Sequence, residues 1–150
     1  MGTITVRADE KLVHGNVLNS WYENSTFTCL IIADDTLASD SFLKNLTSVL
    51  VPYELDTTIC KVEDIQRYLK KYETEDVMIL CRTPTQALRV IEQGVDASTV
   101  TLADSCYVSK RMPVKDEHKF SINKLIEKGI RVVVQMMPED NETVLKKYDM

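Results

Sequence analysis

Residues 27–33 read FTCLIIA, a nearly unbroken apolar run that is rich in β-branched side chains. A strand that is covered on one face alternates between apolar and polar residues, whereas a strand that is covered on both faces reads as a continuous apolar run. We therefore expect these residues to form a buried strand. Further runs of the same kind predict strands at Ile4–Val6, Leu55–Cys60, Val77–Cys81, Val100–Ala103 and Ile130–Gln135.

The segments between these runs have helical spacing. In residues 62–72, apolar side chains recur at intervals of three, four and three residues, so they line one face of a helix that can pack on a sheet. The same relation holds within residues 17–21, 42–49, 87–91 and 122–126. Strands that alternate with helices over short loops predict an α/β fold with a mainly parallel twisted sheet of about six or seven strands and helices on both faces.

Residues that typically begin or end helices support this order of elements. Thr83 before Pro84 predicts a helix N-cap followed by a first-turn proline, while Gly94 and Gly129 predict the ends of two helices. No linker or repeat divides the chain, which has 150 residues, 44% of them hydrophobic. A single domain over residues 1–150 is therefore expected, since one core suffices at this length.

The charge and the cysteines narrow the function classes. A formal net charge of −5 argues against a nucleic-acid partner, which would need clustered basic residues. No apolar run approaches the roughly 20 residues of a membrane span, and no signal peptide is recognisable, so we expect a soluble protein. Cys29, Cys60, Cys81 and Cys106 form no Cys-x-x-Cys pair, which favours buried reduced thiols over a disulfide framework or a zinc site.

The candidate site is His14, in the segment DEKLVHGN at residues 9–16, directly after the first predicted strand. In parallel α/β sheets, ligands bind beyond the carboxyl ends of the strands, near the point where the strand order reverses. A neutral imidazole is a good nucleophile toward phosphorus, and a helix N-terminus favours an anion. This position is therefore typical of a histidine that carries a phosphoryl group.

The neighbours of His14 suggest supporting roles. Lys11 could supply a positive point charge, and the backbone N–H groups of Gly15 and Asn16 could contact phosphate oxygens. Asp9 could orient the imidazole or brace Lys11. No metal or organic cofactor is needed for this chemistry, and the sequence contains no nucleotide-binding glycine pattern.

Structural interpretations compete with these roles. A lone histidine at the start of a helix is more often a capping or packing residue than a nucleophile. Asp34 and Asp35, after the second strand, fit a helix cap or an active-site rim better than a magnesium site. We expect His118 to be an exposed first-turn residue, and residues 136–142 to form a loop that enters a short final helix.

The segment VRADEKLVHGNV at residues 6–17, followed by Trp21, closely resembles the N-terminal signature of the IIB subunits of the mannose/fructose/sorbose family of the bacterial sugar phosphotransferase system. That family's pattern reads VRIDDRLIHGQV, with a tryptophan a few residues later. The resemblance continues through LIIADD at residues 30–35 and through TPTQAL at residues 83–88.

The resemblance implies a phosphocarrier subunit with a mainly parallel α/β sheet. His14 would accept a phosphoryl group from a phosphohistidine on a IIA protein or domain, and would deliver it to a sugar bound by the membrane subunits IIC and IID. Such a protein would lie in the cytoplasm, against the inner face of the membrane through these partners. A homo-oligomer is compatible with this interpretation.

One departure keeps a second hypothesis open. Residues 101–105 read TLADS where the family has NVGGM, so both glycines are lost and a carboxylate, Asp104, is gained. In the family this loop borders the active site, where a carboxylate would repel a phosphoryl group. The alternative function is a non-catalytic regulatory or interaction module with the same fold.

Overall fold

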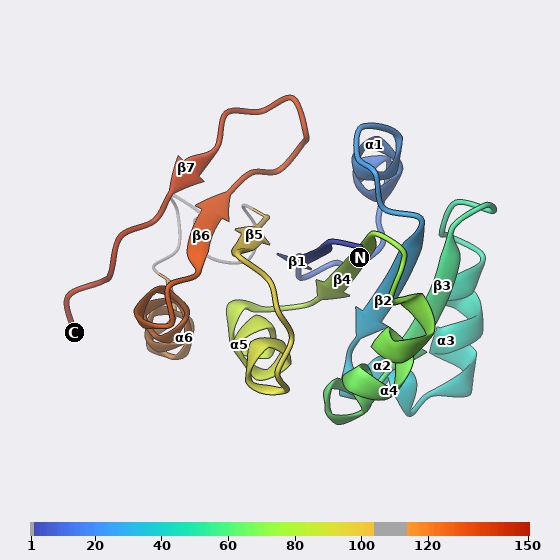
Figure 1. Cartoon of the computed structure of the whole chain (residues 1–150), viewed down its shortest axis with the longest axis horizontal. Coiled ribbons are helices and arrows are strands. Elements are labelled where there is room, and N and C mark those ends of the chain that lie inside the picture. The colour runs from blue at the N-terminus through green and yellow to red at the C-terminus, as the bar shows by residue number, and fades with distance from the viewer. Residues whose placement is uncertain (1, 104–113) are drawn as a thin grey trace.

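The sheet has seven strands in the order β3-β2-β4-β1-β5-β6-β7 in the computed structural model, which describes residues 2–103 and 114–150. Strands β1 to β6 are parallel, and β7 runs antiparallel to β6 (Figure 1). The strands are β1 (Ile4–Ala8), β2 (Cys29–Ala33), β3 (Asp56–Cys60), β4 (Val77–Cys81), β5 (Thr99–Leu102), β6 (Arg131–Val134) and β7 (Thr143–Val144). The α-helices are α1 (Val17–Glu23), α2 (Asp35–Ala38), α3 (Ser41–Ser48), α4 (Ile65–Leu69), α5 (Pro84–Glu92) and α6 (Asp116–Glu127), with short 3₁₀ turns at Val62–Asp64 and Lys70–Tyr72.

Both faces of the sheet are covered, as the unbroken apolar runs predict. Along β2, Cys29, Ile31 and Ala33 belong to the core cluster that also contains the apolar residues of α4, α5 and α6. Leu30 and Ile32 point to the other face, in the cluster that contains Leu18 of α1. Figure 1 shows α1 on one side of the sheet and α4, α5 and α6 on the opposite side. The predicted doubly covered α/β sheet is confirmed.

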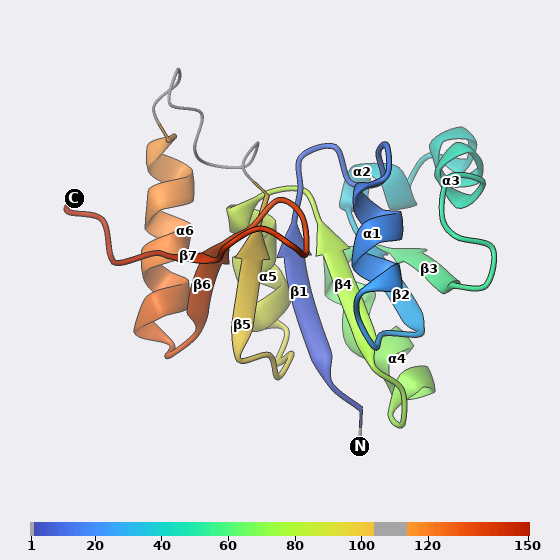
Figure 2. The same cartoon turned by 90° about the horizontal axis from the view of Figure 1, so that it is seen from above.

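The order of the strands creates a switch point between β1 and β4. From β1 the chain passes through α1 to β2, on the far side of β4, whereas from β4 it passes through α5 to β5, on the far side of β1. These two connections leave neighbouring strands in opposite directions and on opposite faces (Figure 2). The loops after β1 and β4 therefore diverge at the carboxyl edge of the sheet, where α/β proteins bind their ligands.

The residues that the sequence predicted to cap helices do so at this edge of the sheet. Thr83 caps α5, because its hydroxyl accepts a hydrogen bond from the backbone N–H of Gln86 at 3.1 Å, and Pro84 occupies the first turn. Asp34 caps α2 in the same manner by accepting from the backbone N–H of Leu37 at 2.9 Å. The cap interpretation of Asp34 is confirmed, and both caps lie just after strands that neighbour each other, β4 and β2.

Two sequence expectations are wrong. The apolar side chains within residues 42–49 do not pack on the sheet: α3 has no buried residue, and Phe42 and Val49 are 73% and 75% exposed. The end of the chain is not a helix, because Thr143 and Val144 pair with β6 as an antiparallel edge strand. Periodicity shows which face of a helix is apolar but does not show whether another element covers it, and the edge of β6 offers backbone partners that a local pattern does not reveal.

The cysteines support the prediction of reduced buried thiols. Cys29, Cys60 and Cys81 are buried and free. Burial raises the pKa of the Cys60 thiol to about 11, so this side chain stays protonated and unreactive at neutral pH. Cys106 lies outside the described residues.

Candidate functional site

The loop that carries His14 is folded by the side chain of Asp9. Asp9 extends β1 by one hydrogen bond, from its backbone N–H to the carbonyl of Cys81 at 2.8 Å. Its Oδ1 atom then accepts the backbone N–H of Lys11 at 3.0 Å, and its carbonyl accepts the N–H of Leu12 at 2.9 Å. An aspartate that binds the backbone two residues ahead makes a tight turn directly after the strand.

Leu12 has an unusual backbone conformation in this turn. It is the only non-glycine residue with a positive φ in the described ranges 2–103 and 114–150, at 55°. Such a backbone costs about 1–3 kcal/mol, and burial of a leucine side chain contributes about 1.5–3 kcal/mol in the opposite sense. The Leu12 side chain is buried in the core cluster on the α1 face, so packing holds the strained turn in one shape.

The turn brings His14 back onto Asp9. The His14 Nε2 atom lies 2.7 Å from Asp9 Oδ2, and the side chains are 23% and 1% exposed. A carboxylate can only accept a hydrogen bond, so Nε2 carries the hydrogen and Nδ1 of the neutral ring keeps its lone pair. The contact thus joins a buried carboxylate to a ring that is partly open to solvent.

The other predicted site residues, Lys11, Gly15 and Asn16, lie close to His14 in the chain. The contact between Lys11 and Asp9 is made by the backbone N–H of Lys11, and the side chain of Lys11 is exposed. Gly15, with a φ of 48°, and Asn16, the N-cap residue of α1, follow the histidine and are also exposed. Their proposed contacts with phosphate oxygens stay predictions.

Arg7 and Trp21, which the signature contains but to which the sequence assigned no role, anchor α1 over the sheet. Arg7 is buried and donates hydrogen bonds to the carbonyls of Gln135 and Met136, both at 2.8 Å. Its guanidinium lies 4.7 Å from the centre of the Trp21 ring, whose Nε1 donates to the Met136 carbonyl at 2.9 Å. This cation–π pair ties α1 to the segment after β6 and so fixes the helix that begins next to His14.

Arg82 is a further residue at this edge, and the sequence did not point to it. Its Nη1 atom donates to the carbonyl of Glu10 at 2.8 Å, and its Nε atom lies 3.5 Å from Asp34 Oδ1. Gln86 bonds to both Arg82 and Asp34. Its Oε1 accepts a hydrogen bond from the backbone N–H of Arg82 at 2.6 Å, and its Nε2 donates one to Asp34 Oδ1 at 2.8 Å. The guanidinium is therefore positioned between the His14 loop and the end of β2.

His118 differs from its predicted exposure. The residue is buried in the first turn of α6, with its Nδ1 atom 3.2 Å from the Thr85 hydroxyl, which also accepts a hydrogen bond from Ser121 at 3.0 Å. Burial lowers the pKa of His118 below its ordinary value of 6.5, because the charged ring would lose hydration. Its role is to join α5 to α6. Asp104 and Ser105, in the segment that departs from the signature, lie outside the described residues.

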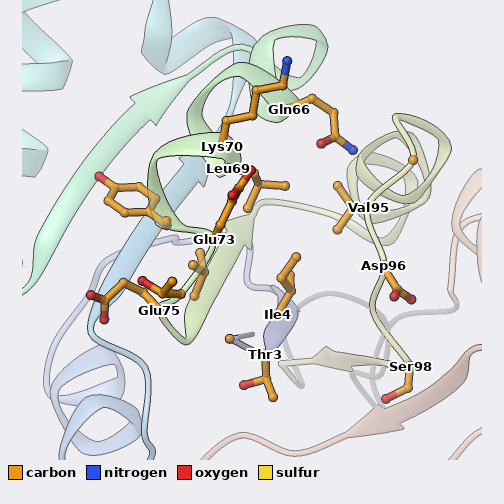
Figure 3. A pocket seen from close by; sticks show the side chains of 15 residues that line it. Thr3, Ile4, Gln66, Leu69, Lys70, Glu73, Glu75, Val95, Asp96 and Ser98 are labelled. Atoms are coloured by element: carbon orange, nitrogen blue, oxygen red, sulfur yellow. The ribbon is translucent and has the colours of Figure 1, made fainter.

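A hollow that is large for a molecule of this size lies at the opposite edge of the sheet. A cavity of about 830 Å³ opens beside the amino ends of β1, β4 and β5, and Figure 3 shows Ile4, Glu73, Val95 and Asp96 around it. Its lining mixes apolar, acidic and basic side chains, and Lys70 lies at its rim. His14 and Asp9 do not line this cavity.

Comparison with known proteins identifies the family. The family described as the PTS system sorbose subfamily IIB component, where PTS is the phosphotransferase system, matches residues 3–148 of the chain. The chain belongs to this family. As a IIB component it is a phosphocarrier subunit that takes part in sugar uptake.

Individual relatives of this IIB component have low sequence identity to it, but the similarity extends over almost the whole chain. The PTS system fructose-specific EIIB component of Bacillus subtilis is 22% identical over 148 residues, which cover 93% of this chain and 91% of the relative. The PTS system mannose-specific EIIAB component of Escherichia coli is 26% identical over 152 residues, which cover 96% of this chain and 46% of the relative. The chain thus spans about half the length of the mannose-specific relative.

A solved structure shows the same fold. The crystal structure of the PTS system N-acetylgalactosamine-specific IIB component 1 from Escherichia coli superposes with a TM-score of 0.86 at 22% identity, covering 96% of this chain and 100% of the other. Within residues 2–103 and 114–150, no helix of this IIB component is long and apolar enough to cross a membrane. In that same part of the chain, no three His, Cys, Asp or Glu side chains are grouped so that they could hold a metal ion.

Proposed function

We propose that Nδ1 of His14 receives the phosphoryl group from a phosphohistidine of a IIA protein or domain and passes it to a sugar held by the IIC and IID membrane subunits. The observation that carries this proposal is the 2.7 Å contact between His14 Nε2 and the buried Asp9 carboxylate. This contact directs the ring so that the nitrogen opposite Asp9 is the nucleophile.

Each transfer exchanges one phosphorus–nitrogen bond for another bond. In the first step the lone pair of His14 Nδ1 attacks phosphorus, and the electron pair of the donor bond returns to the IIA imidazole. In the second step the sugar hydroxyl attacks phosphorus, the electron pair returns to Nδ1, and the hydroxyl proton passes to a base of the membrane subunit or to water. The protein's contribution is position and electrostatics, because the transferring group is charged throughout.

Asp9 has a further role after the first step. A ring that carries phosphorus on Nδ1 and hydrogen on Nε2 is positively charged, so a carboxylate on Nε2 stabilises it. Lys11 adds a point charge, and the backbone N–H groups of Gly15 and Asn16 contact the phosphoryl oxygens. No metal or organic cofactor takes part. The proposed place of the protein is the cytoplasm, against the inner face of the membrane through its partner subunits.

Two findings support the choice of partners. The mannose-specific relative has A and B components in one chain, so a IIA donor is a natural partner of a IIB component. Family membership links this chain to a sugar phosphotransferase system, and the resemblance of its signature implies that the IIC and IID membrane subunits would hold the sugar.

Phosphorylation in vitro tests the proposal. The protein is incubated with the phosphorylated general relay proteins of the system and a cognate IIA, and an acid-labile, base-stable phosphate is measured. The chain has two histidines, which gives a matched control: His14→Ala should take no label, and His118→Gln should take the wild-type amount. Coupling of ³¹P to ¹⁵N identifies the ring nitrogen.

The outcomes separate the two functions. A label that persists in His14→Ala would rule out His14 as the acceptor. Absence of label on the wild type with several IIA donors would favour the non-catalytic module. The oriented pair of Asp9 and His14 supports the carrier, because Asp9 Oδ2 contacts the partly exposed imidazole in addition to the turn contact that Oδ1 makes with the Lys11 N–H.

A further inference from the structure

We infer that Arg82 is a positioning residue of the phosphoryl-transfer site, because its side chain fixes the peptide group that holds Asp9 in place. The inference rests on the proposed function, in which Asp9 orients His14. It begins with the register of the sheet, where Ala8 of β1 is paired with Cys81 of β4. The residues that follow these two, Asp9 and Arg82, therefore leave the carboxyl edge side by side.

The contact between the two loops passes through a single peptide group. Arg82 Nη1 donates to the carbonyl of Glu10 at 2.8 Å. The N–H of the same peptide group belongs to Lys11, and it donates to Asp9 Oδ1 at 3.0 Å. A trans peptide group is planar and rigid, with its C=O and N–H on opposite sides, so a donor that fixes the oxygen also fixes the direction of the N–H. Arg82 therefore sets the direction of the N–H that Asp9 accepts.

Asp9 carries this constraint to His14. Its Oδ1 atom accepts the Lys11 N–H, and its Oδ2 atom lies 2.7 Å from His14 Nε2. Both oxygens belong to one planar carboxyl group, and the side chain is 1% exposed, so a rotation that breaks one contact also disturbs the other. Arg82 therefore acts on the imidazole through Asp9, by way of two hydrogen bonds and one peptide group.

Gln86 and Asp34 hold Arg82 in this orientation. Gln86 Oε1 accepts the backbone N–H of Arg82 at 2.6 Å, and Gln86 Nε2 donates to Asp34 Oδ1 at 2.8 Å. A backbone N–H can only donate, which settles the orientation of the glutamine amide. The same Oδ1 atom lies 3.5 Å from Arg82 Nε. Asp34 is 2% exposed, so this end of the network lies in a low-dielectric environment that strengthens its contacts.

Helix capping does not account for the contacts of the Arg82 side chain. Asp34 caps α2 with Oδ2, which accepts the Leu37 N–H at 2.9 Å, whereas Arg82 approaches Oδ1. The cap of α5 is the Thr83 hydroxyl, which accepts the Gln86 N–H at 3.1 Å. Both caps are complete without the Arg82 side chain, so its hydrogen bond to the loop after β1 serves that loop.

A double-mutant cycle tests whether Arg82 acts through Asp9. Transfer from phospho-IIA is measured by rapid quench in the wild type, Arg82→Met, Asp9→Ala and the double variant. Methionine keeps an apolar stem but donates no hydrogen bond, and alanine lacks the oxygens that accept the Lys11 N–H. We expect Arg82→Met to slow transfer roughly tenfold in the wild type and by less than about twofold in Asp9→Ala. Equal losses in both backgrounds overturn the inference, since Arg82 would then act independently of Asp9.

Arg89→Met is the matched control. Arg89 of α5 has nearly the exposure of Arg82, 45% against 42%, and is paired with the Asp35 carboxylate at 3.0 Å. Arg89→Met should transfer at the wild-type rate, and Arg82→Lys should restore part of the rate, because a lysine can donate to the Glu10 carbonyl. An equal loss in Arg89→Met and Arg82→Met would overturn the inference, since positive charge rather than this contact would then matter.

Hydrogen exchange of the Lys11 amide tests the contact without any transfer reaction. We expect this amide, which donates to Asp9, to exchange roughly tenfold faster in Arg82→Met than in the wild type. The Thr28 amide, which donates to the Asp76 carbonyl at the amino edge, should keep its wild-type rate. Unchanged exchange at Lys11 overturns the inference, as does equally faster exchange at Thr28, which would indicate general destabilisation. If IIA fails to phosphorylate the wild type, the proposed function fails, while this measurement still decides whether Arg82 holds the Asp9 turn.

Discussion

The two edges of the sheet differ in the features that they offer to a ligand, and the volume of a cavity does not indicate which edge contains the functional site. The amino edge has a cavity of about 830 Å³, lined by a mixture of apolar and charged side chains. The carboxyl edge has the Asp9–His14 pair, one buried carboxylate on one partly exposed ring. A phosphocarrier receives a group of a few atoms from another protein, so it needs an oriented, accessible nucleophile rather than a deep pocket. The partner protein then excludes water from the reacting atoms.

Asp9→Asn is expected to give the largest effect and tests the carboxyl edge directly. An amide can donate to Nε2 through its nitrogen, which favours the tautomer with hydrogen on Nδ1 and removes the nucleophilic lone pair. We expect the rate of transfer from phospho-IIA, measured by rapid quench, to fall by roughly 100-fold or more. Asp96→Asn, in the lining of the amino-edge cavity, is the matched control and should transfer at the wild-type rate. Wild-type transfer by Asp9→Asn would show that the carboxylate is dispensable.

A pair of glycines, one at each edge, gives a sharper comparison. Gly15 has a φ of 48° and Gly94 a φ of 89°, values that cost an alanine about 1–2 kcal/mol. An added Cβ would meet nothing within 4 Å at Gly15 and only the end of the Gln66 side chain, at 3.4 Å, at Gly94. Gly15→Ala and Gly94→Ala should therefore lose similar free energies of unfolding, measured in urea.

Transfer rates then distinguish the two glycine variants. Gly15 follows His14, the proposed nucleophile, so a shifted backbone there should slow phosphoryl transfer severalfold, whereas Gly94→Ala should keep the wild-type rate. Equal rates in both variants would mean that the backbone after His14 tolerates displacement and does not contact the phosphoryl group.

The sequence predicted the features that depend on neighbours in the chain. The apolar runs located all six parallel strands, and the signal was clearest for β2 and β4, because burial on both faces makes every residue of these strands apolar. The placement of Asp9 and His14 after the first strand followed from the same pattern together with the signature. The Thr83 cap depended on residues within a single turn and was also predictable.

The features that the sequence did not reveal depend on distant residues. Arg82 reaches the Glu10 carbonyl across 72 positions, through the pairing of β1 with β4, and no local pattern encodes that register. His118 is buried because α6 packs against α5, where Thr85 provides a partner, although its acidic and basic neighbours suggested a solvated turn. The exposure of α3 and the edge strand β7 are likewise set by which elements meet in space.

His118 yields a smaller, pH-dependent effect within the carboxyl edge. Its pKa is lowered in the folded protein, so the unfolded chain binds more protons between the folded value and 6.5. The free energy of unfolding should therefore fall as the pH decreases through 6.5, and stay constant well above it. His118→Gln should show a weaker decrease between pH 7.5 and pH 5 in urea unfolding. An identical pH profile in both proteins would contradict the burial of a neutral ring.

Lys70→Gln should have the smallest effect, and it tests whether the amino-edge cavity takes part in transfer at all. Lys70 is exposed at the rim of that cavity, at the end of the strands opposite to His14. Charges of this kind are screened over about 8 Å at physiological ionic strength, and exposed substitutions usually change stability by less than about 0.5 kcal/mol. The transfer rate should stay within about twofold of the wild type at 150 mM salt, a range that corresponds to that energy. A loss of transfer rate comparable to that of Asp9→Asn would mean that the cavity is coupled to the histidine through the sheet, and the division of the molecule into a reactive carboxyl edge and an uninvolved amino edge would be wrong.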